Sequence, residues 1–587
     1  MIKIFRNLKK RDLLFIFFST ALIVFQVWLD LKMPDYTQKL TQSISSGDLK
    51  MKDVRNNGMM MLLCAFGSML ASMACGFFTS QVAANFSKTL RTKLFGKIMT
   101  FSSREINKFS TPSLITRTTN DVIHMQMLLA VGAQVLIKAP ITAVWAILKI
   151  SNTNMKWTTA VIICVVEIVC VISVLVALAF PKFRMIQKLT DKLNDTIREN
   201  LSGVRVVRAF NAESYEEAKF DKVNENITKN HLFTSRILGL MMPVLTMSMS
   251  GLTLAIYWIG ACIIKETQIM GRAEVMGNMV AFTQYALQVV SAFMMLILIF
   301  ILLPRTMVSA GRINEVLDTE VDIEFKETGV SSEKNGTVQF KNVSFRYNDA
   351  PEYCLKNIDF TINKGETFAV IGATGTGKTS LINLIPRFYD VSEGEVLIDG
   401  VNVKEYSEKE LVDKVSLAPQ KATLFSGTIK SNITYGCDES KADGDRLTKA
   451  LEISSCDFVN DLPLKEDTSV AQGATNFSGG QKQRMSIARA VYKDSEILIF
   501  DDTFSALDYK TDMMVRKSLK EKLSDKTIII VAQRIGTIKN ADKILVLNNG
   551  ETAGIGTHEE LLKNCSVYKE IALSQLSEDE LNGMEEK

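Results

Sequence analysis

The run Gly372–Ser380 (GATGTGKTS) has the residue types and spacing of a phosphate-binding loop. It follows an apolar segment, 368–371, and precedes another that begins at Leu381, so we expect a strand, a loop and a helix. Glycines let backbone N–H groups point at phosphate, and the helix start adds a positive field. Lys378 is expected to reach the β- and γ-phosphates, and the Thr379 hydroxyl to bind Mg²⁺. The predicted ATP contacts in this loop are Gly372, Thr374, Gly375, Thr376, Gly377, Lys378, Thr379 and Ser380.

A second apolar run, Ile497–Phe500, ends in two carboxylates, Asp501 and Asp502. A carboxylate at a strand end is typical of the metal site that accompanies a phosphate loop. We expect Asp501 to hold Mg²⁺, through water.

Between these runs lies Asn476–Arg484 (NFSGGQKQR), which resembles the LSGGQ signature of the ABC transporter ATPases. The resemblance covers essentially the whole chain and is to the exporter type, in which six membrane spans precede the nucleotide-binding domain. In that family, Ser478, Gly479, Gly480 and Gln481 would bind the γ-phosphate of a nucleotide held by the other subunit. The resemblance therefore implies two nucleotide domains that close head to tail around two ATP molecules.

Other family elements occur in order. Tyr347, in the run VSFRY, matches the aromatic residue that stacks on adenine. Gln420, in the run APQ, matches the glutamine that contacts Mg²⁺. Ser505–Asp508 (SALD) matches the D-loop. The implied cofactors are ATP and Mg²⁺.

The chain departs from the family pattern at two catalytic positions. Asp502 stands where the family usually has a glutamate that polarises the attacking water, and Gln533 stands where a histidine contacts the γ-phosphate. An aspartate carboxylate is set back by about 1.5 Å, and such a displacement can cost about 100-fold in rate. We therefore expect a heterodimer with unequal sites, in which this chain binds ATP but hydrolyses it slowly, while its signature completes the partner's site. A homodimer that tolerates the two changes is the alternative.

Six apolar stretches are long enough to cross a bilayer, whose apolar core of about 30 Å needs about 20 residues of helix. They lie at about 13–33, 58–84, 129–150, 157–180, 237–264 and 276–303. An even number of spans puts both ends of the chain on one side. Basic residues before the first span place that side in the cytoplasm; they are Lys3, Arg6, Lys9, Lys10 and Arg11.

Two long polar segments, about 85–128 and 181–236, face the same side and are each interrupted near the middle, at 109–113 and after Phe210. They are either solvated helical hairpins or, as the resemblance favours, carriers of coupling helices that dock on the nucleotide domain. The sequence thus divides into a transmembrane domain (1–305), a linker (306–336), an α/β nucleotide-binding domain (337–575) and a polar tail (576–587).

Ionisable and polar residues within the spans mark a possible cavity. Lys138 and Glu167 would be costly in lipid unless they face protein or water. They either contact a cargo or form a structural pair with an opposite charge. Gln284 and Gln288 form a polar edge on the sixth span, among methionines that suit varied ligands or simple packing.

The leading functional hypothesis is ATP-driven export of amphipathic or hydrophobic compounds, as in multidrug transport, across a bacterial cytoplasmic membrane. Export of peptides or lipids is open. An ATP-gated channel or regulatory membrane subunit is the alternative from another class. The net charge of +4 is too small to indicate a nucleic-acid partner. The expected partners are a second, non-identical half, an amphipathic cargo and membrane lipid.

Overall fold

The computed structural model describes residues 2–6, 8–47, 51–151, 155–268, 271–330, 332, 336–347, 350–437 and 443–575. It divides into two compact units. The helical unit comprises residues 1–99 and 109–319, and the α/β unit comprises residues 100–108 and 320–587. The predicted tail, 576–587, lies outside the described residues.

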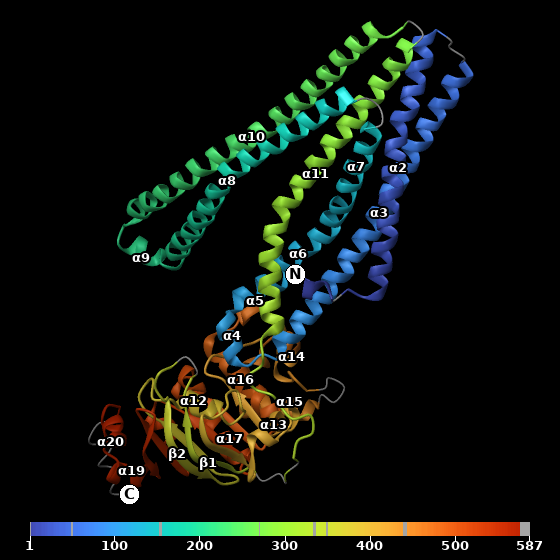
Figure 1. Ribbon diagram of the computed structural model, residues 1–587. Coiled ribbons are helices and arrows are strands. Elements are labelled where there is room, and N and C mark those ends of the chain that lie inside the picture. Colours follow the sequence, from blue (N-terminus) through green and yellow to red (C-terminus); the bar gives the residue numbers. More distant parts are fainter. Residues whose placement is uncertain are drawn as a thin grey trace. The chain divides into compact units, whose positions relative to one another are not determined.

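Six helices of the described chain are long and apolar enough to cross a membrane, which confirms the predicted number of spans (Figure 1). The long helices of the helical unit are α2 (Lys10–Ser46), α3 (Met51–Met99), α7 (Ala133–Ser151), α8 (Met155–Ser202), α10 (Glu213–Glu266) and α11 (Arg272–Asp318). Helices α3, α8 and α10 have 49, 48 and 54 residues. At about 1.5 Å per residue each is more than twice as long as the apolar core of a bilayer. The spans therefore continue as helices into the polar segments, as predicted.

Both predicted interruptions are present. Helices α8 and α10 lie side by side and are joined through the short helix α9 (Val204–Ala209), which has no buried residue (Figure 1). In the first polar segment, Ser110 has a positive φ of 61° and separates α4 (Ser103–Phe109) from α5 (Thr111–Thr118). The predicted break at 109–113 is thus correct, and a separate short helix immediately precedes it. Residues 100–108 belong to the α/β unit.

The third span begins with an irregularity. Helix α6 (Asn120–Met127) passes into a π turn, Leu128–Gly132, before α7 begins. A Cβ atom on Gly132 would lie 2.8 Å from Cδ1 of Leu128, so a larger residue here would require the Leu128 side chain to shift. Such π turns insert an extra residue into the helical repeat.

The boundary between the units lies later than the end of the apolar sequence indicates. Helix α11 runs without a break to Asp318, so the first part of the predicted linker continues the last span. The chain after Thr319 lies on the α/β unit, where the Val330 N–H donates to the Glu405 carbonyl (3.2 Å). The Ser332 hydroxyl is also 2.7 Å from the hydroxyl of Tyr406.

The α/β unit contains two main sheets. One is antiparallel, with the order β2-β1-β4-β5; its strands are β1 (Val338–Phe345), β2 (Leu355–Ile362), β4 (Glu393–Ile398) and β5 (Val401–Asn402). The other has the order β12-β11-β3-β10-β9-β6. Its strands are β3 (Thr367–Ile371), β6 (Val415–Ala418), β9 (Ile497–Asp501), β10 (Thr527–Val531), β11 (Lys543–Asn548) and β12 (Glu551–Gly556). This is the α/β domain that the sequence predicts.

Strand order determines which distant residues meet. Strands β3, β10, β9 and β6 are adjacent and parallel, so their carboxyl ends share one edge of the sheet. The phosphate loop follows β3, Gln533 follows β10, Asp501 ends β9, and Gln420 follows β6. Four segments that are far apart in sequence are thereby brought to one place.

A buried charge cluster stabilises the join between the two sheets. The Lys414 ammonium lies 2.6 Å from Asp399 and 3.4 Å from Glu496. The side chain of Lys414 is 8% exposed and that of Asp399 is fully buried. Removing one member of such a cluster leaves buried charge without compensation.

We therefore expect Lys414→Met to lower the free energy of unfolding around β4 and β6 by about 3 kcal/mol. Hydrogen exchange of these strands in the full chain measures the effect directly. Lys404→Met is the matched control, because its ammonium is 3.9 Å from Asp390 and 43% of its side chain is exposed. Equal exchange in both variants would contradict a stabilising role for the cluster.

Candidate functional site

The phosphate loop connects β3 to helix α12 (Lys378–Asn383). Gly375 and Gly377 have φ values of 87° and 95°, which favour glycine. A Cβ atom on Gly372 would lie 2.4 Å from the Leu547 carbonyl oxygen, so close backbone approach also favours glycine there. The glycines of the motif are thus explained by the local geometry.

Lys378 closes the loop on itself. Its ammonium donates to the carbonyls of Gly372 (2.8 Å) and Ala373 (2.7 Å), and the side chain is buried. Burial lowers the pKa of Lys378, while the carboxylates of Asp502 and Asp501 oppose this shift. Phosphate oxygens can replace the two carbonyls as acceptors, so the loop suits an anionic ligand.

Asp501 and Thr379 form the oxygen pair expected at the metal position. The Thr379 hydroxyl donates to the Asp501 carboxylate (3.2 Å), and Asp501 is only 5% exposed. Burial raises the pKa of Asp501, against the opposing effects of the Thr379 hydrogen bond and Lys378. A cation would relieve this penalty, and hard oxygen ligands are those that Mg²⁺ prefers. The residues present therefore fit Mg²⁺-bound nucleotide.

The two departures from the family pattern meet at one carboxylate. The side-chain amides of Gln420 (3.2 Å) and Gln533 (2.9 Å) both donate to the same oxygen of Asp502. Asp502 is 9% exposed and has a positive φ of 46°, and its N–H donates to the Val531 carbonyl (3.0 Å). The carboxylate is therefore fixed by two amide hydrogen bonds, and the backbone of Asp502 is fixed by a third hydrogen bond.

Tyr347 lies at the side of the loop. Its hydroxyl is 2.8 Å from the Ser380 hydroxyl, and its ring meets Phe345 and Tyr389 edge-on. Within the α/β unit, a cleft of about 390 Å³ is lined by Tyr347 together with Arg104 and Asn107 of α4. Sequence reasoning predicted a docking segment here but did not associate it with the aromatic residue.

The signature begins helix α16 (Gly479–Tyr492). Ser478 is its N-cap: the Ser478 Oγ accepts from the Gln481 N–H (3.3 Å), and the Gln481 side chain accepts from the Ser478 N–H (2.9 Å). Ser478 and Gly479 are exposed. A formed and exposed helix start is suited to bind an anion brought by another molecule.

In the helical unit, Lys138, Gln284 and Gln288 line one cavity, but Glu167 does not. The Glu167 carboxylate accepts instead from the Ser248 hydroxyl (3.2 Å). The partner of Lys138 is Asp30, at 3.6 Å. Sequence reasoning did not single out Asp30, although a carboxylate inside a predicted span was a sufficient signal.

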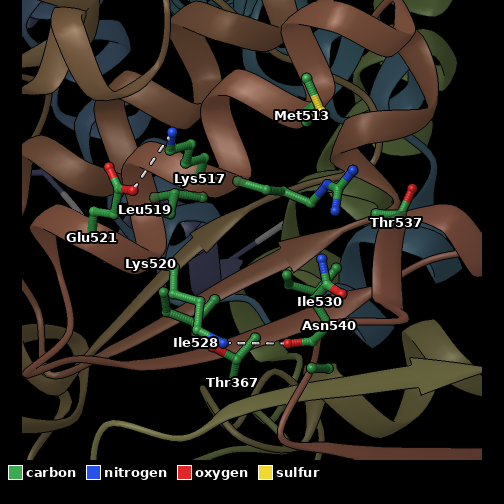
Figure 2. A pocket seen from close by; sticks show the side chains of 12 residues that line it. Thr367, Met513, Lys517, Leu519, Lys520, Glu521, Ile528, Ile530, Thr537 and Asn540 are labelled. Carbon is green, nitrogen blue, oxygen red and sulfur yellow. Dashed lines mark hydrogen bonds and ion pairs between the residues drawn. The ribbon is translucent and has the colours of Figure 1, made fainter. Parts of the chain in front are cut away.

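A cleft on another part of the α/β unit is not a candidate for nucleotide binding (Figure 2). It lies between β10 and helix α17 (Tyr509–Lys522) and includes Thr367, the first residue of β3 and so at the end opposite the phosphate loop. Its charged groups are already engaged: Lys517 pairs with Glu521 (3.9 Å), and Lys520 donates to the Asn540 carbonyl (3.5 Å) (Figure 2).

Comparisons with known proteins agree with this geometry. The family described as ABC transporter transmembrane region matches residues 16–303, and ABC transporter matches residues 355–505. An uncharacterized ABC transporter ATP-binding protein of Mycobacterium tuberculosis is 38% identical over 88% of this chain and 87% of its own length. An ATP-dependent lipid A-core flippase of Pseudomonas aeruginosa is 30% identical over 89% of this chain and 85% of its own.

The fold is also similar to that of a solved structure, a bacterial Atm1-family ABC exporter with ATP bound. The TM-score is 0.81, with 23% identity, over 97% of this chain and all of that one. The chain belongs to the ABC transporters, as a half-transporter of the exporter type that unites a six-helix membrane region and an ATP-binding domain. It is therefore an ATP-driven membrane transporter, and halves of this type generally act as dimers.

Proposed function

We propose that this chain is one half of a heterodimeric exporter that moves amphipathic or hydrophobic compounds across the cytoplasmic membrane. Its own nucleotide site grips ATP and hydrolyses it slowly, while its signature, Ser478–Gln481, completes the active site of a non-identical partner. The observation that carries this proposal is the Asp502 carboxylate, which is held by the amides of Gln420 and Gln533.

The roles of the binding residues follow from their positions. Lys378 and the loop N–H groups would hold the phosphates, and Tyr347 would stack on adenine. Thr379, Asp501 and Gln420 would hold Mg²⁺, which supplies positive charge that offsets the phosphates. None of these functions needs the glutamate and histidine that the chain lacks, so binding is retained.

Slow hydrolysis follows from what Asp502 can do. A general base must reach the proton that it abstracts and be free to accept it. The shorter side chain withdraws the carboxylate, and both amides occupy one of its oxygens. Gln533 is an amide and takes up no proton near neutral pH, so it does not replace histidine in acid–base chemistry.

The tip of the α8–α10 hairpin provides evidence for a partner subunit. Its apolar side chains are strongly exposed: Leu201 is 72% exposed, Val206 60% and Phe210 79%. Exposed apolar groups clustered in this way mark interaction surfaces. A second half of the transporter would cover them. The basic residues before the first span support a cytoplasmic location for the α/β unit and both termini in this proposal.

Lipid export is a second candidate, because two relatives are named ATP-dependent lipid A-core flippases. An ATP-gated channel is a third candidate, because a site that binds nucleotide and hydrolyses it slowly is suited to control the opening of a channel. Uptake of a labelled amphiphile into inverted vesicles against its gradient, in the presence of ATP, separates a pump from a channel. A channel dissipates the gradient instead.

Photolabelling with azido-ATP on ice tests whether the nucleotide site of this chain binds ATP and retains it. We expect this chain to be labelled even when the assembled transporter is irradiated after one turnover of the partner, because the site releases its nucleotide slowly. Lys378→Ala should lower labelling by about tenfold, a loss of about 1.4 kcal/mol of binding. Lys364→Ala, at an exposed lysine in the same unit, is the control. Labelling that is lost as fast as in the partner would contradict the proposal.

A further inference from the structure

A cavity of about 360 Å³ opens among helices α2, α7 and α11 of the helical unit. Its polar members are Asp30, Lys138, Thr142, Gln284, Gln288 and Ser291. Its apolar wall includes Met33, Leu287 and Met295. The cavity thus combines a polar end with flexible apolar side chains, which suit ligands of varied shape.

The charge pair in this cavity is loose. The Lys138 ammonium lies 3.6 Å from the Asp30 carboxylate, beyond hydrogen-bond distance, and Lys138 makes no hydrogen bond to the residues that the structure describes. Asp30 is better held, because its carboxylate accepts from the Ser68 hydroxyl (2.5 Å). The Lys138 ammonium is therefore paired with Asp30 but not saturated by hydrogen bonds, so it can bind a ligand, in a membrane-spanning segment where charge is costly.

Two further polar atoms in the cavity wall lack partners. Thr142 Oγ1 and Gln288 Oε1 are buried and have no hydrogen bond in the described structure. The amide nitrogen of Gln288 donates to the Asp30 carbonyl (3.2 Å), so the amide oxygen of Gln288 points away from that carbonyl. A buried polar atom without a partner costs about 1–3 kcal/mol, so a ligand that turns these side chains toward the cavity and bonds to them would be favoured.

A neighbouring charge cluster shows what a closed structural pair looks like in this unit. The Lys149 ammonium lies 2.8 Å from Asp35, and the Tyr285 hydroxyl donates to the same carboxylate. Neither Lys149 nor Asp35 lines the cavity. The Asp30–Lys138 pair differs in three respects: its charges are further apart, both residues line a cavity, and polar atoms without partners lie beside it.

We propose that this cavity is a cargo subsite for the dipolar head group of a zwitterionic amphiphile. The anionic part of the head group binds the ammonium of Lys138, and the cationic or N–H part lies toward Asp30 and Gln288. The apolar tail lies along Met33, Leu287 and Met295. A zwitterion matches both charges at once, whereas a purely anionic or cationic head leaves one of them repelled. This inference rests on the proposed export function and names the class of its cargo.

The test uses the full chain, purified in its native assembly and reconstituted in nanodiscs. Four probes share a dodecyl tail: dodecylphosphocholine, dodecyltrimethylammonium, dodecanoate and an uncharged dodecyl ether. Binding is measured by titration below the micelle concentration. We expect the zwitterion to bind at least about tenfold more tightly than the other three. Lys138→Met should shift the preference toward the cation, and Asp30→Asn toward the anion.

Two further arms separate a binding role from a structural one. Lys149→Met, at the closed pair, should leave the order of the probes unchanged. The exchange Asp30→Lys/Lys138→Asp keeps an ion pair but reverses its direction; a structural pair would be rescued, whereas the preference for the zwitterion should fall. Replacing phosphatidylcholine in the disc by phosphatidylglycerol should tighten probe binding if the natural head group belongs to a bilayer lipid, and leave it unchanged if the cargo enters from water.

Equal binding of the four probes, or an order that is the same in wild type, Lys138→Met and Asp30→Asn, would overturn the subsite. Azido-ATP labelling on the same samples keeps the two failures apart. Normal labelling without probe discrimination refutes only the subsite, whereas absence of labelling and of ATP-driven uptake refutes the export function.

Discussion

Substituting the signature serine, Ser478→Arg, should lower ATP turnover of the assembled transporter by about 100-fold, the usual cost of losing one preorganised donor at a charged reaction centre. The same assembly carrying Asp502→Asn should keep its turnover within about threefold, since that carboxylate contributes little to an already slow site. The two positions lie in one chain, yet they serve different nucleotides. Steady-state phosphate release from the purified assembly measures both.

The reason for this inequality lies in helix α16. Ser478 caps the helix and leaves its first N–H groups exposed. An arginine side chain would remove the cap and obstruct the approach of a phosphate held by the partner. Ser524→Arg, at an exposed serine in a turn of the same unit, controls for the added charge and bulk. Equal losses from Ser478→Arg and Asp502→Asn would show that the two sites share the work, and the proposal of unequal sites would fall.

The second large effect is expected from restoring both missing groups. The isolated chain should turn over ATP slowly, and Asp502→Glu alone should change this by no more than about threefold because Gln533 still lacks acid–base chemistry. The double variant Asp502→Glu/Gln533→His should be about 100-fold faster than either single variant, provided that two copies assemble. Single-turnover kinetics on the purified chain separate the hydrolytic step from ATP binding.

The structure explains why the two changes must be made together. Gln533 and Gln420 donate to one oxygen of Asp502, so the carboxylate and its neighbours form a single unit. A matched control pairs Asp502→Glu with Gln472→His, which places a histidine at an exposed position elsewhere. Brisk turnover by the unmodified single chain would overturn the heterodimer, and full rescue by Asp502→Glu alone would exclude a role for Gln533.

Local patterns in the sequence were sufficient to predict the ATP-binding domain and the number of spans, and the expected phosphate loop and metal carboxylate rest on patterns of the same kind. Each depends on neighbours within a few residues: glycines at fixed spacing, apolar residues before Asp501, and continuous apolar runs. The geometry of the loop, with Lys378 on the carbonyls of Gly372 and Ala373, is consistent with the loop prediction.

Long-range contacts were not predictable from the same patterns. Asp502 meets Gln533 because β10 pairs with both β3 and β9, and nothing in the sequence of a buried strand specifies its neighbours. Asp30 could have been singled out as a carboxylate within a predicted span, but its contact with Lys138 joins two helices that are far apart in sequence and does not follow from the apolar pattern. The apolar run of α11 stops before its helix does, so the apolar pattern alone does not locate the end of that helix.

The π turn at Leu128–Gly132 preserves the direction in which the membrane part of the third span presents its side chains. Each residue of an α-helix turns the chain by about 100°, so one residue more or fewer rotates everything that follows by that angle. The hydrogen bonds of a π turn close over one residue more than those of an α-helix, so the turn absorbs an inserted residue and Lys138 keeps facing Asp30. The five-residue irregularity therefore confines an insertion to one turn, and deleting a single residue from it should restore a regular α-helix without re-aiming the rest of the span.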